Sequence, residues 1–489
     1  MSIKKHTAYN LLGALLPLGL SLVTIPLYIS WIGEARYGVL AVAWLLLGYF
    51  GLFDLGLGRA TAQRIAALGD ASSEKMSSTF WTALTMNVSL GVLGGLIIWP
   101  VANYFFNNFF SVDSALRPEL AAAIPWLILA VPLATLSGVL TGALEGRTKF
   151  LDLNIISVAS SALIQLVPLA VVWLHGPDLA WLLPAVILSR LVTLSVLFLR
   201  CRVHVFHHHK PTFSRAQAKG LLQFGGWVTV SSLVGPLMVV LDRFVIGATL
   251  GAKAVTYYTV PFQLAERTTL LPGALTTALF PRLAAVGQDE ARQLATKAVS
   301  SLAVVTTPLI LVAVLLVEPF LHWWLNPEFA LQAGLTAQLL LLGFWINAFA
   351  RVPFALLQAA GKPSVIAKCH LAELIPYLLL LYVGLQFWGL PGAALVFSLR
   401  TLADCALLMW FSGTLGSGVT VLKTPVLLLF AGLAIAVAIQ VNSALWWSAV
   451  AGLMLISLVW SWRAAPPEIR NLMTRLVKKP SPFNKENLL

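Results

Sequence analysis

Long apolar segments separated by short polar turns dominate this chain of 489 residues. A helix needs about 20 apolar residues to cross a hydrocarbon core of about 30 Å. By this measure the sequence predicts about fourteen transmembrane helices. We place them at residues 8–32, 38–58, 78–103, 120–144, 152–174, 180–199, 221–247, 254–280, 299–324, 332–358, 365–387, 391–413, 425–442 and 445–462.

The composition excludes an ordinary soluble protein. Hydrophobic residues make up 59% of the chain, charged residues make up 10%, and the mean hydropathy is +0.86. Soluble domains carry about 25% charged residues, because their surface must be solvated. Without a signal-peptide cleavage site, the first apolar segment is expected to remain as a span. Three scattered cysteines predict no disulfide framework. We therefore expect an all-α membrane protein.

The net charge of +13 is a topology signal. If the N-terminus is cytoplasmic, most lysines and arginines fall in cytoplasmic turns and in the C-terminal tail, whereas Arg36, Arg117 and Lys253 face outward. Membrane proteins concentrate positive residues on the cytoplasmic side. The pattern predicts a multi-pass protein of the bacterial inner membrane with both termini inside, and the basic excess does not indicate nucleic-acid binding.

The second half of the chain repeats features of the first half. Gly33 precedes Arg64 by the same interval as Gly251 precedes Arg282, and Gly146-Arg147 matches Gly361-Lys362. The sixth and twelfth spans each carry one mid-depth arginine, Arg190 and Arg400. These matches predict two pseudo-symmetric six-helix lobes, as in transporters that work by alternating access. The predicted division is an N-lobe at 1–205, a basic linker at 206–220, a C-lobe at 221–413, two further helices at 414–463 and a basic tail at 464–489.

Charged residues inside the predicted spans are candidates for function. Charge at bilayer depth is costly, so such residues pair with each other or face a wet cavity. The set comprises Asp54, Arg190, Asp242, Arg243, Glu266, Arg267, Arg351, Glu373, Arg400 and Asp404. Arg400 and Asp404 lie one helical turn apart, so we expect these two to pair.

Polar residues recur at helical spacing on several predicted spans. They include Gln165 on the fifth span, Gln263 on the eighth and Asn347 on the tenth. Hydrogen bonding between helices would explain such residues. A shared cavity explains better why the stripes recur on spans that the repeat makes equivalent.

Arginine suits phosphate, because its planar guanidinium is always charged and binds two oxygens at once. Arg243, Arg267 and Arg351 fall on three spans expected to form the cavity. We predict that they bind a diphosphate, with Arg190, Arg400, Asn347, Gln263 and Gln165 as further substrate-binding residues. Glu266, Glu373 and Asp404 are candidates for coupling transport to an ion. The alternative is that these carboxylates only neutralise arginines.

No enzyme motif is present in the sequence. We find no phosphate-cradling glycine loop, no zinc-protease signature and no nucleophile setting. His204 and His207-His208-His209 lack a carboxylate or cysteine partner at metal spacing. Histidines in such a pattern are more often part of a solvated basic loop than of a metal site. We expect a protein that is not an enzyme and needs neither cofactor nor metal.

Several short motifs resemble those of bacterial oligosaccharide flippases of the Wzx type, which belong to the multidrug/oligosaccharidyl-lipid/polysaccharide exporter superfamily. The motifs are Trp31-Ile32-Gly33-Glu34-Ala35-Arg36-Tyr37-Gly38, Leu52-Phe53-Asp54-Leu55-Gly56-Leu57-Gly58-Arg59-Ala60, Leu241-Asp242-Arg243-Phe244-Val245-Ile246-Gly247 and Leu279-Phe280-Pro281-Arg282-Leu283. The resemblance covers all twelve core spans. It makes Asp54 and Gly56 the turn motif at the end of the second span, and Asp242 and Arg243 the Asp-Arg motif of the seventh.

The resemblance implies movement of an undecaprenyl-diphosphate-linked glycan from the cytoplasmic to the outer leaflet, for surface polysaccharide such as O-antigen. Membrane lipid and the polysaccharide polymerase machinery are the further partners it implies. The sequence departs from the lipid II flippases of this superfamily in one respect. They carry arginines along the first span, whereas no charge lies between Lys5 and Glu34 here, which counts against a peptidoglycan precursor as the substrate. The alternative function is a cation-coupled multidrug antiporter of the same superfamily, which an arginine-rich lumen disfavours.

Overall fold

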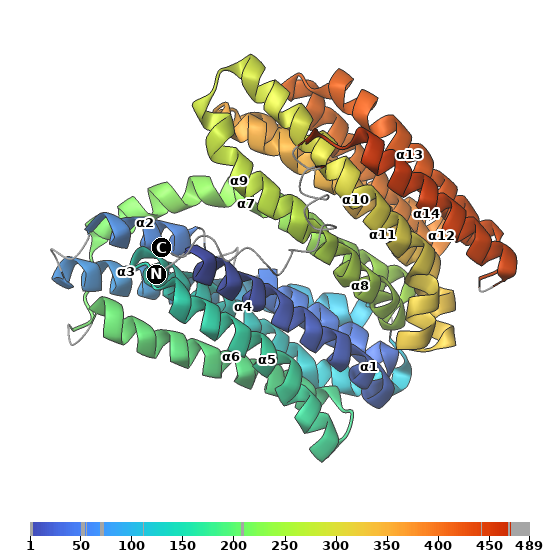
Figure 1. Ribbon diagram of the computed structural model, residues 1–489. Coiled ribbons are helices and arrows are strands. Elements are labelled where there is room, and N and C mark those ends of the chain that lie inside the picture. The colour runs from blue at the N-terminus through green and yellow to red at the C-terminus, as the bar shows by residue number, and fades with distance from the viewer. Residues whose placement is uncertain are drawn as a thin grey trace, which may run out of the picture. The chain divides into compact units, whose positions relative to one another are not determined.

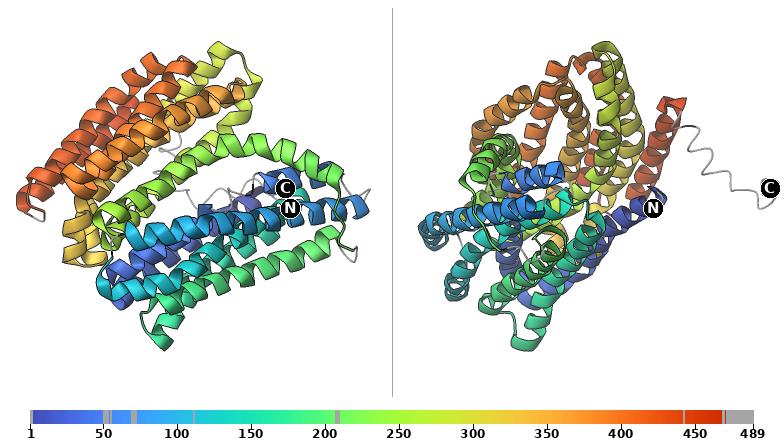
Figure 2. Two further views of the ribbon diagram at one scale, coloured as in Figure 1. Left: turned by 180° about the vertical axis from the view of Figure 1, so that it is seen from behind. Right: turned by 90° about the vertical axis from the view of Figure 1, so that its left-hand side faces the viewer.

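The described part of the chain is helical throughout. The computed structural model describes residues 3–49, 54, 56–68, 73–110, 112–206, 210–441, 443–467 and 470, and of these it describes the side chains except for 3–15, 49, 223–237, 239 and 240. The long helices (Figures 1 and 2) are α1 (Ile3–Tyr49), α3 (Ser73–Asn108), α4 (Arg117–Gly146), α5 (Phe150–His175), α6 (Leu179–Cys201), α7 (Arg215–Leu250), α10 (Gln288–Trp324), α11 (Pro327–Ala359), α12 (Pro363–Ser412), α13 (Leu415–Ala438) and α14 (Ala444–Ala464). The shorter ones are α2 (Leu57–Leu68), α8 (Ala252–Glu266) and α9 (Leu270–Ala285), with single turns at Ser114–Leu116, Arg202–Phe206 and Arg267–Thr269.

The predicted fold class, an all-α membrane protein, is confirmed. Within the described residues nine helices are long and apolar enough to cross a bilayer. Two of the continuous helices each correspond to two predicted spans that meet at a kink. The kink lies at Gly33 in α1 and at Gly389 in α12. The predicted span 254–280 is interrupted, since a single turn at Arg267–Thr269 separates α8 from α9. The count of fourteen spans stays a prediction.

Positive backbone φ angles recur at matching places in the two halves of the chain. The pairs are Gly33 (79°) with Gly251 (88°), Thr148 (56°) with Gly361 (71°), and Gly176 (90°) with Gly389 (60°). Side chains disfavour this region of φ, so glycine is the default residue there. The turns of the predicted repeat therefore share backbone geometry. In the second pair the residue with positive φ is Thr148, which lies two residues beyond the expected Gly146.

The equivalent turns at Gly33 and Gly251 are joined through Glu34. Thr256 Oγ1 donates a hydrogen bond of 2.6 Å to the Glu34 carbonyl, and Tyr257 Oη donates one of 2.8 Å to Glu34 Oε2. Lys253 Nζ lies 3.0 Å from the same carboxylate oxygen. A methyl group on Gly38 would overlap the Ala252 carbonyl oxygen, so the two backbones touch. We refer to these contacts as the Glu34 cluster.

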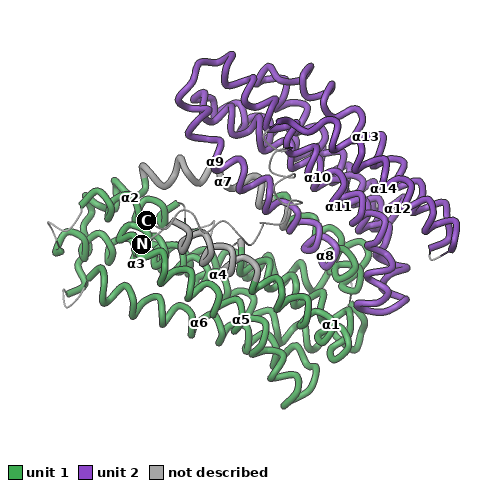
Figure 3. The backbone as a smooth tube through the Cα atoms, in the orientation of Figure 1, with its two compact units in different colours: residues 1–259 green, residues 260–489 purple. Residues whose placement is uncertain are grey.

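The chain divides into two compact units, residues 1–259 and 260–489 (Figure 3). In the first unit α4 packs against α2, α3 and α6, and α5 packs against α1 and α6. The predicted seventh span, α7, also belongs to this unit, where it contacts α1, α2 and α3. The predicted lobe, linker and tail boundaries stay predictions; His207-His208-His209 and residues 471–489 lie outside the described part of the chain.

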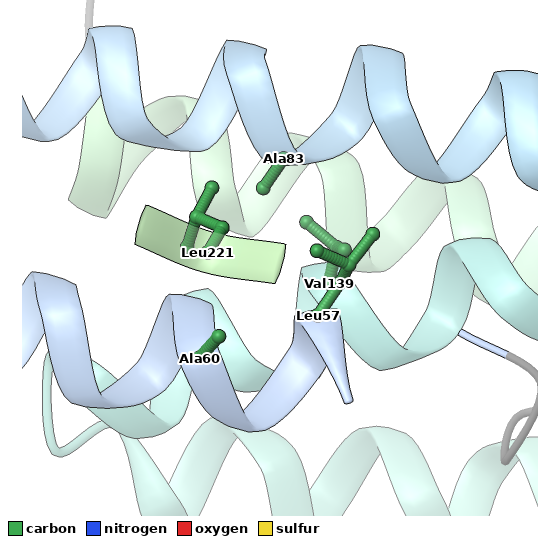
Figure 4. Packing of buried hydrophobic residues seen from close by; sticks show 5 residues of the cluster. All are labelled: Leu57, Ala60, Ala83, Val139 and Leu221. Carbon is green, nitrogen blue, oxygen red and sulfur yellow. The ribbon is translucent and has the colours of Figure 1, made fainter. Parts of the chain in front are cut away.

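Glycines let α2 and α4 approach until their backbones touch. Gly138, Gly142 and Gly146 are spaced four residues apart on α4, so they share one face. A Cβ atom on Gly142 would lie 2.1 Å from the Gly58 carbonyl oxygen, and one on Gly146 would lie 2.7 Å from that of Ala62. Beside this contact, Leu57, Ala60, Ala83, Val139 and Leu221 form an apolar cluster that brings together α2, α3, α4 and α7 (Figure 4). Small residues are typical of tightly packed membrane helices.

In the second unit α11 packs against α9, α10 and α12, and α10 also contacts α13 and α14. The kink at Gly389 folds α12 back on itself, so that Gly384 and Gly392 come into close contact. A Cβ atom on Gly392 would lie 2.1 Å from the Gly384 carbonyl oxygen. Ser461 Oγ of α14 donates a 3.0 Å hydrogen bond to the Val304 carbonyl of α10. The two C-terminal helices are therefore part of this unit and are packed onto α10.

Candidate functional site

A cavity of about 510 Å³ lies among α9, α11 and α12 in the second unit. It combines a guanidinium, a carboxylate, an imidazole, amides, hydroxyls and aromatic rings. Its lining consists of Thr276, Thr277, Phe280, Asn347, Ala350, Arg351, Phe354, Ala355, Gln358, His370, Asp404 and Leu408. Three of the predicted site residues, Arg351, Asn347 and Asp404, are thus brought together. A mostly preformed cavity with a few convergent polar groups is the usual form of a ligand site.

Arg351 is the cation of this cavity. Among the described residues, no hydrogen bond or ion pair engages its guanidinium, and its Nε is buried without an acceptor. The side chain passes Gly273 of α9, where a Cβ atom would lie 3.5 Å from Arg351 Nη1. The Glu266 carboxylate acts on it electrostatically. A partly buried guanidinium without a protein acceptor is prepared to bind an anion.

Arg267 lies in the single turn that connects α8 and α9, and Gln263 lies within α8. The turn that holds Arg267 packs against α11, and Arg267 and Glu266 are both exposed. Arg267 and Arg351 thus lie in one compact unit, whereas Arg243 lies in the other. The predicted convergence of all three arginines stays a prediction.

The charges of α12 find partners across its kink. Asp404 Oδ1 lies 3.4 Å from His370 Nε2, and Arg400 Nη1 lies 3.9 Å from Glu373 Oε2. Within the described residues neither Glu373 oxygen has a hydrogen-bond donor, although the residue is buried. The Arg400 guanidinium also lies over the Tyr377 ring, 5.6 Å from its centroid. Sequence spacing alone favoured pairing of Arg400 with Asp404, and it missed the partners that the folded-back helix supplies.

Asp242 and Arg243 form a buried ion pair in the first unit. Arg243 Nη1 donates hydrogen bonds of 2.6 and 2.8 Å to the two Asp242 oxygens. The Tyr258 hydroxyl donates to Asp242 Oδ2 at 3.3 Å, and its ring lies 5.2 Å below the guanidinium. The side chains of Arg243 and Asp242 are 2% and 1% exposed. In this conformation Arg243 is therefore buried against Asp242 and Tyr258.

Two other predicted substrate residues of the first unit are engaged by protein. Gln165 accepts a 2.9 Å hydrogen bond from Thr24 and donates to the Ser161 carbonyl, and its own carbonyl accepts from Tyr28. These contacts hold α1 against α5. Arg190 donates a 2.7 Å hydrogen bond to Ser137.

The Asp54 motif shapes a turn. The Asp54 carboxylate accepts hydrogen bonds of 2.8 and 2.9 Å from the backbone amides of Gly56 and Gly58, at the start of α2. Carboxylates stabilise helix starts in this way. Gly138 leaves room for the carboxylate, because a Cβ there would lie 2.4 Å from Asp54 Oδ2. The motif neighbours Leu52, Phe53 and Leu55 lie outside the described residues.

A sequence profile of the polysaccharide biosynthesis protein family matches residues 32–330. The chain belongs to the polysaccharide biosynthesis protein family. A putative O-antigen transporter of Shigella flexneri is 30% identical over 413 residues, which cover 84% of this chain and 97% of the relative. The lipopolysaccharide biosynthesis protein WzxC of Escherichia coli K12 is 23% identical over 410 residues, covering 82% and 79%. The predicted membership of the Wzx-type group is confirmed.

Solved structures share the fold of this polysaccharide biosynthesis family member. The lipid II flippase MurJ in an inward closed conformation matches with a TM-score of 0.69 and 13% identity, covering 96% of this chain and 99% of that one. An inward-facing multidrug resistance MATE family transporter of the MOP superfamily matches with a TM-score of 0.68 and 15% identity, covering 84% and 99%. At these identities the likeness concerns the fold.

Sequence reasoning missed part of the site and the residues around it. Thr276, Thr277 and Phe354 line the cavity although no sequence pattern singled them out. Glu318, a further carboxylate within α10, packs against Gly334 of α11 and was not among the predicted intramembrane charges. Its position in an apolar helix was the signal that could have identified it.

Proposed function

We propose that this multi-pass membrane protein is a flippase for an undecaprenyl-diphosphate-linked oligosaccharide. It moves the glycan from the cytoplasmic to the outer leaflet of the bacterial inner membrane by alternating access, for O-antigen or a related surface polysaccharide. The protein performs no covalent chemistry on its substrate. The names of the curated relatives and membership of the polysaccharide biosynthesis family support this proposal. The bias of basic residues supports an orientation with both termini in the cytoplasm.

The Arg351 cavity is the observation that carries the proposal. Its guanidinium has no acceptor among the described residues, and Thr276, Thr277 and Asn347 place neutral hydrogen-bonding groups around it. A diphosphate would satisfy the guanidinium with two oxygens, while hydroxyls and amides suit a sugar. Arg267, Gln263 and Gln358 extend the proposed binding surface, and Arg190, Arg243, Arg400 and Gln165 remain proposed contacts for other steps of the cycle. A cationic drug would be repelled here, which disfavours the multidrug alternative.

Arg351→Ala should lower glycan export about tenfold or more, since a hydrogen bond to a charged group is worth about 1.5–3 kcal/mol. Arg351→Lys should restore part of the export, because it keeps the charge but loses the two-pronged geometry. Export is measured as surface glycan in a strain that depends on this protein, with protein abundance measured in parallel. Lys423→Ala, which removes an exposed charge from α13 of the same unit, is the control. Normal export by an abundant Arg351→Ala protein would contradict the proposed site.

We also propose that Glu373 and Asp404 take part in ion coupling, with Glu266 acting through Arg351. Glu373→Gln should abolish the pH dependence of glycan movement in vesicles and leave the protein abundant, because the amide cannot take up a proton. Glu290→Gln, which changes an exposed carboxylate of α10, should keep the dependence. Reduced abundance of Glu373→Gln with an unchanged pH profile would show instead that Glu373 only neutralises Arg400.

A further inference from the structure

A second, elongated groove of about 170 Å³ lies between α5 and α6 of the first unit. Ile155, Leu163, Val192 and Val196 supply its apolar walls, and Asp152 and Arg200 stand at one end. Inside it, Thr193 donates a 3.0 Å hydrogen bond to Ser160, so these hydroxyls have already found partners. The groove is therefore apolar along its length and charged at one end.

The groove is as long as one leaflet of a bilayer. Its α5 wall runs from Asp152 to Leu163. At 1.5 Å per residue this stretch of helix spans about 16 Å, and half of a hydrocarbon core is about 15 Å. In the proposed orientation the charged end lies at the cytoplasmic surface and the other end near the middle of the membrane. One acyl chain of an inner-leaflet lipid fits this length.

The groove lies on the apolar face of α5, opposite to its polar residues. Ser157, Ser161 and Gln165 lie on the opposite face of the helix, and Gln165 holds α1 there. Ser157 on that face is exposed, and so are the groove residues Ile155, Val192 and Val196, at 60%, 43% and 40%, but these three are apolar. Since an α-helix turns by 3.6 residues, Ile155 and Ala159 point away from the Ser157 and Ser161 stripe. A ligand of this groove would thus come from the bilayer.

The charged end of the groove has an excess of positive charge. His204 Nε2 lies 3.3 Å from Asp152 Oδ2, so the carboxylate of the groove has a partner. Lys149 and Arg200 lie close enough to act electrostatically on the same histidine, and Arg202 is exposed beside it. In the described part of the chain no ion pair engages Arg200 or Arg202. Each such cation near an anionic surface contributes about 1 kcal/mol to lipid attraction.

We propose that the α5–α6 groove is a binding site for one anionic glycerophospholipid of the cytoplasmic leaflet. One acyl chain lies along Ile155, Val192 and Val196, and the phosphate binds Arg200 and Lys149. This site lies on the opposite side of α5 from Gln165, the residue of that helix proposed as a substrate contact. It rests on the proposed orientation and not on which glycan the protein moves.

The test uses the full-length protein purified in detergent, with bound lipid quantified by native mass spectrometry after mixing with phosphatidylglycerol or phosphatidylcholine. We expect the wild-type protein to retain several-fold more phosphatidylglycerol than phosphatidylcholine. Arg200→Glu, an exposed substitution, and Val192→Trp, which fills the groove, should each remove that preference. Arg215→Glu and Leu188→Trp are matched controls, because they change an exposed cation and an exposed α6 residue outside the groove.

Three outcomes would overturn the proposal. Equal retention of the two lipids would show ordinary annular lipid. Unchanged preference in Arg200→Glu would place the anionic lipid elsewhere, even if Val192→Trp failed to fold. Preferential displacement of phosphatidylglycerol by undecaprenyl phosphate would make the occupant a substrate lipid. A wild-type protein that kept the phosphatidylglycerol preference but moved no lipid-linked glycan in vesicles would count against the proposed function alone.

Discussion

Replacing Asp242 with alanine should remove most of the folded protein from the membrane. The substitution leaves the Arg243 guanidinium, which is 2% exposed, without the carboxylate that accepts its two hydrogen bonds. Breaking a buried ion pair by deleting one partner costs about 3–5 kcal/mol, because the remaining charge stays buried and loses its counter-charge. Abundance and thermal unfolding of the purified protein measure the effect. Asp289→Ala is the matched control, since it breaks an Asp–Arg contact of 3.0 Å in which both side chains are largely exposed.

A double variant separates stability from transport at this position. Asp242→Leu combined with Arg243→Met removes both charges, and apolar replacement of a buried pair is often neutral. We expect the double variant to recover abundance. Normal export by it would limit Arg243 to a structural role, whereas failed export would support the proposed contact with substrate. Abundance of Asp242→Ala equal to that of Asp289→Ala would contradict the assignment of a stabilising pair.

Gly142→Ala should also deplete the folded protein. The added methyl group would lie 2.1 Å from the Gly58 carbonyl oxygen and 2.8 Å from its carbon. Both are backbone atoms, so no side-chain rotation relieves the overlap and α2 must move away from α4. Overpacking of this kind costs about 1–3 kcal/mol or more. The melting temperature in detergent and the abundance in membranes should both fall.

Gly452→Ala is the control for this substitution. It adds the same methyl group to α14, where nothing lies within 4 Å of it. There the variant should be as stable as the wild type or slightly more stable, because alanine has the higher helix propensity. If both variants melted alike, the α2–α4 backbone contact would not be needed for stability.

The helices were predictable because a bilayer imposes the same two requirements on every span. Backbone polar groups must be satisfied within the helix, and the apolar length must match the membrane. Breaks at Gly33, Gly251 and Gly389 were likewise readable, since their neighbours carry polar or proline residues. Which helices touch was not readable. The packing of α7 in the first unit and the contact of Gly58 with Gly142 depend on neighbours that an apolar sequence does not specify.

The site was predictable in its residue types and only partly in its partners. Arg351, Asn347 and Asp404 were selected as polar residues in apolar helices, and they line one cavity. The sequence predicted a pair of Arg400 with Asp404, because helical spacing identifies only neighbours within one straight helix. The folded-back shape of α12 instead brings Glu373 to Arg400 and His370 to Asp404. Arg243 was selected as a ligand for phosphate, whereas burial and the Asp242 contact became visible only in three dimensions.

The Glu34 cluster has a consequence for how molecules are distributed among transport states. It joins equivalent turns of the two repeats at the end predicted to face outward, so any state that separates these turns must break its hydrogen bonds. A ratio of two states changes tenfold for every 1.4 kcal/mol, and one hydrogen bond to a charged group is worth about that or more. Glu34 would therefore affect transport even if the substrate never contacts it. The cluster would set the fraction of unloaded molecules that wait in the conformation holding these turns together, and hence the apparent affinity for a substrate that binds elsewhere.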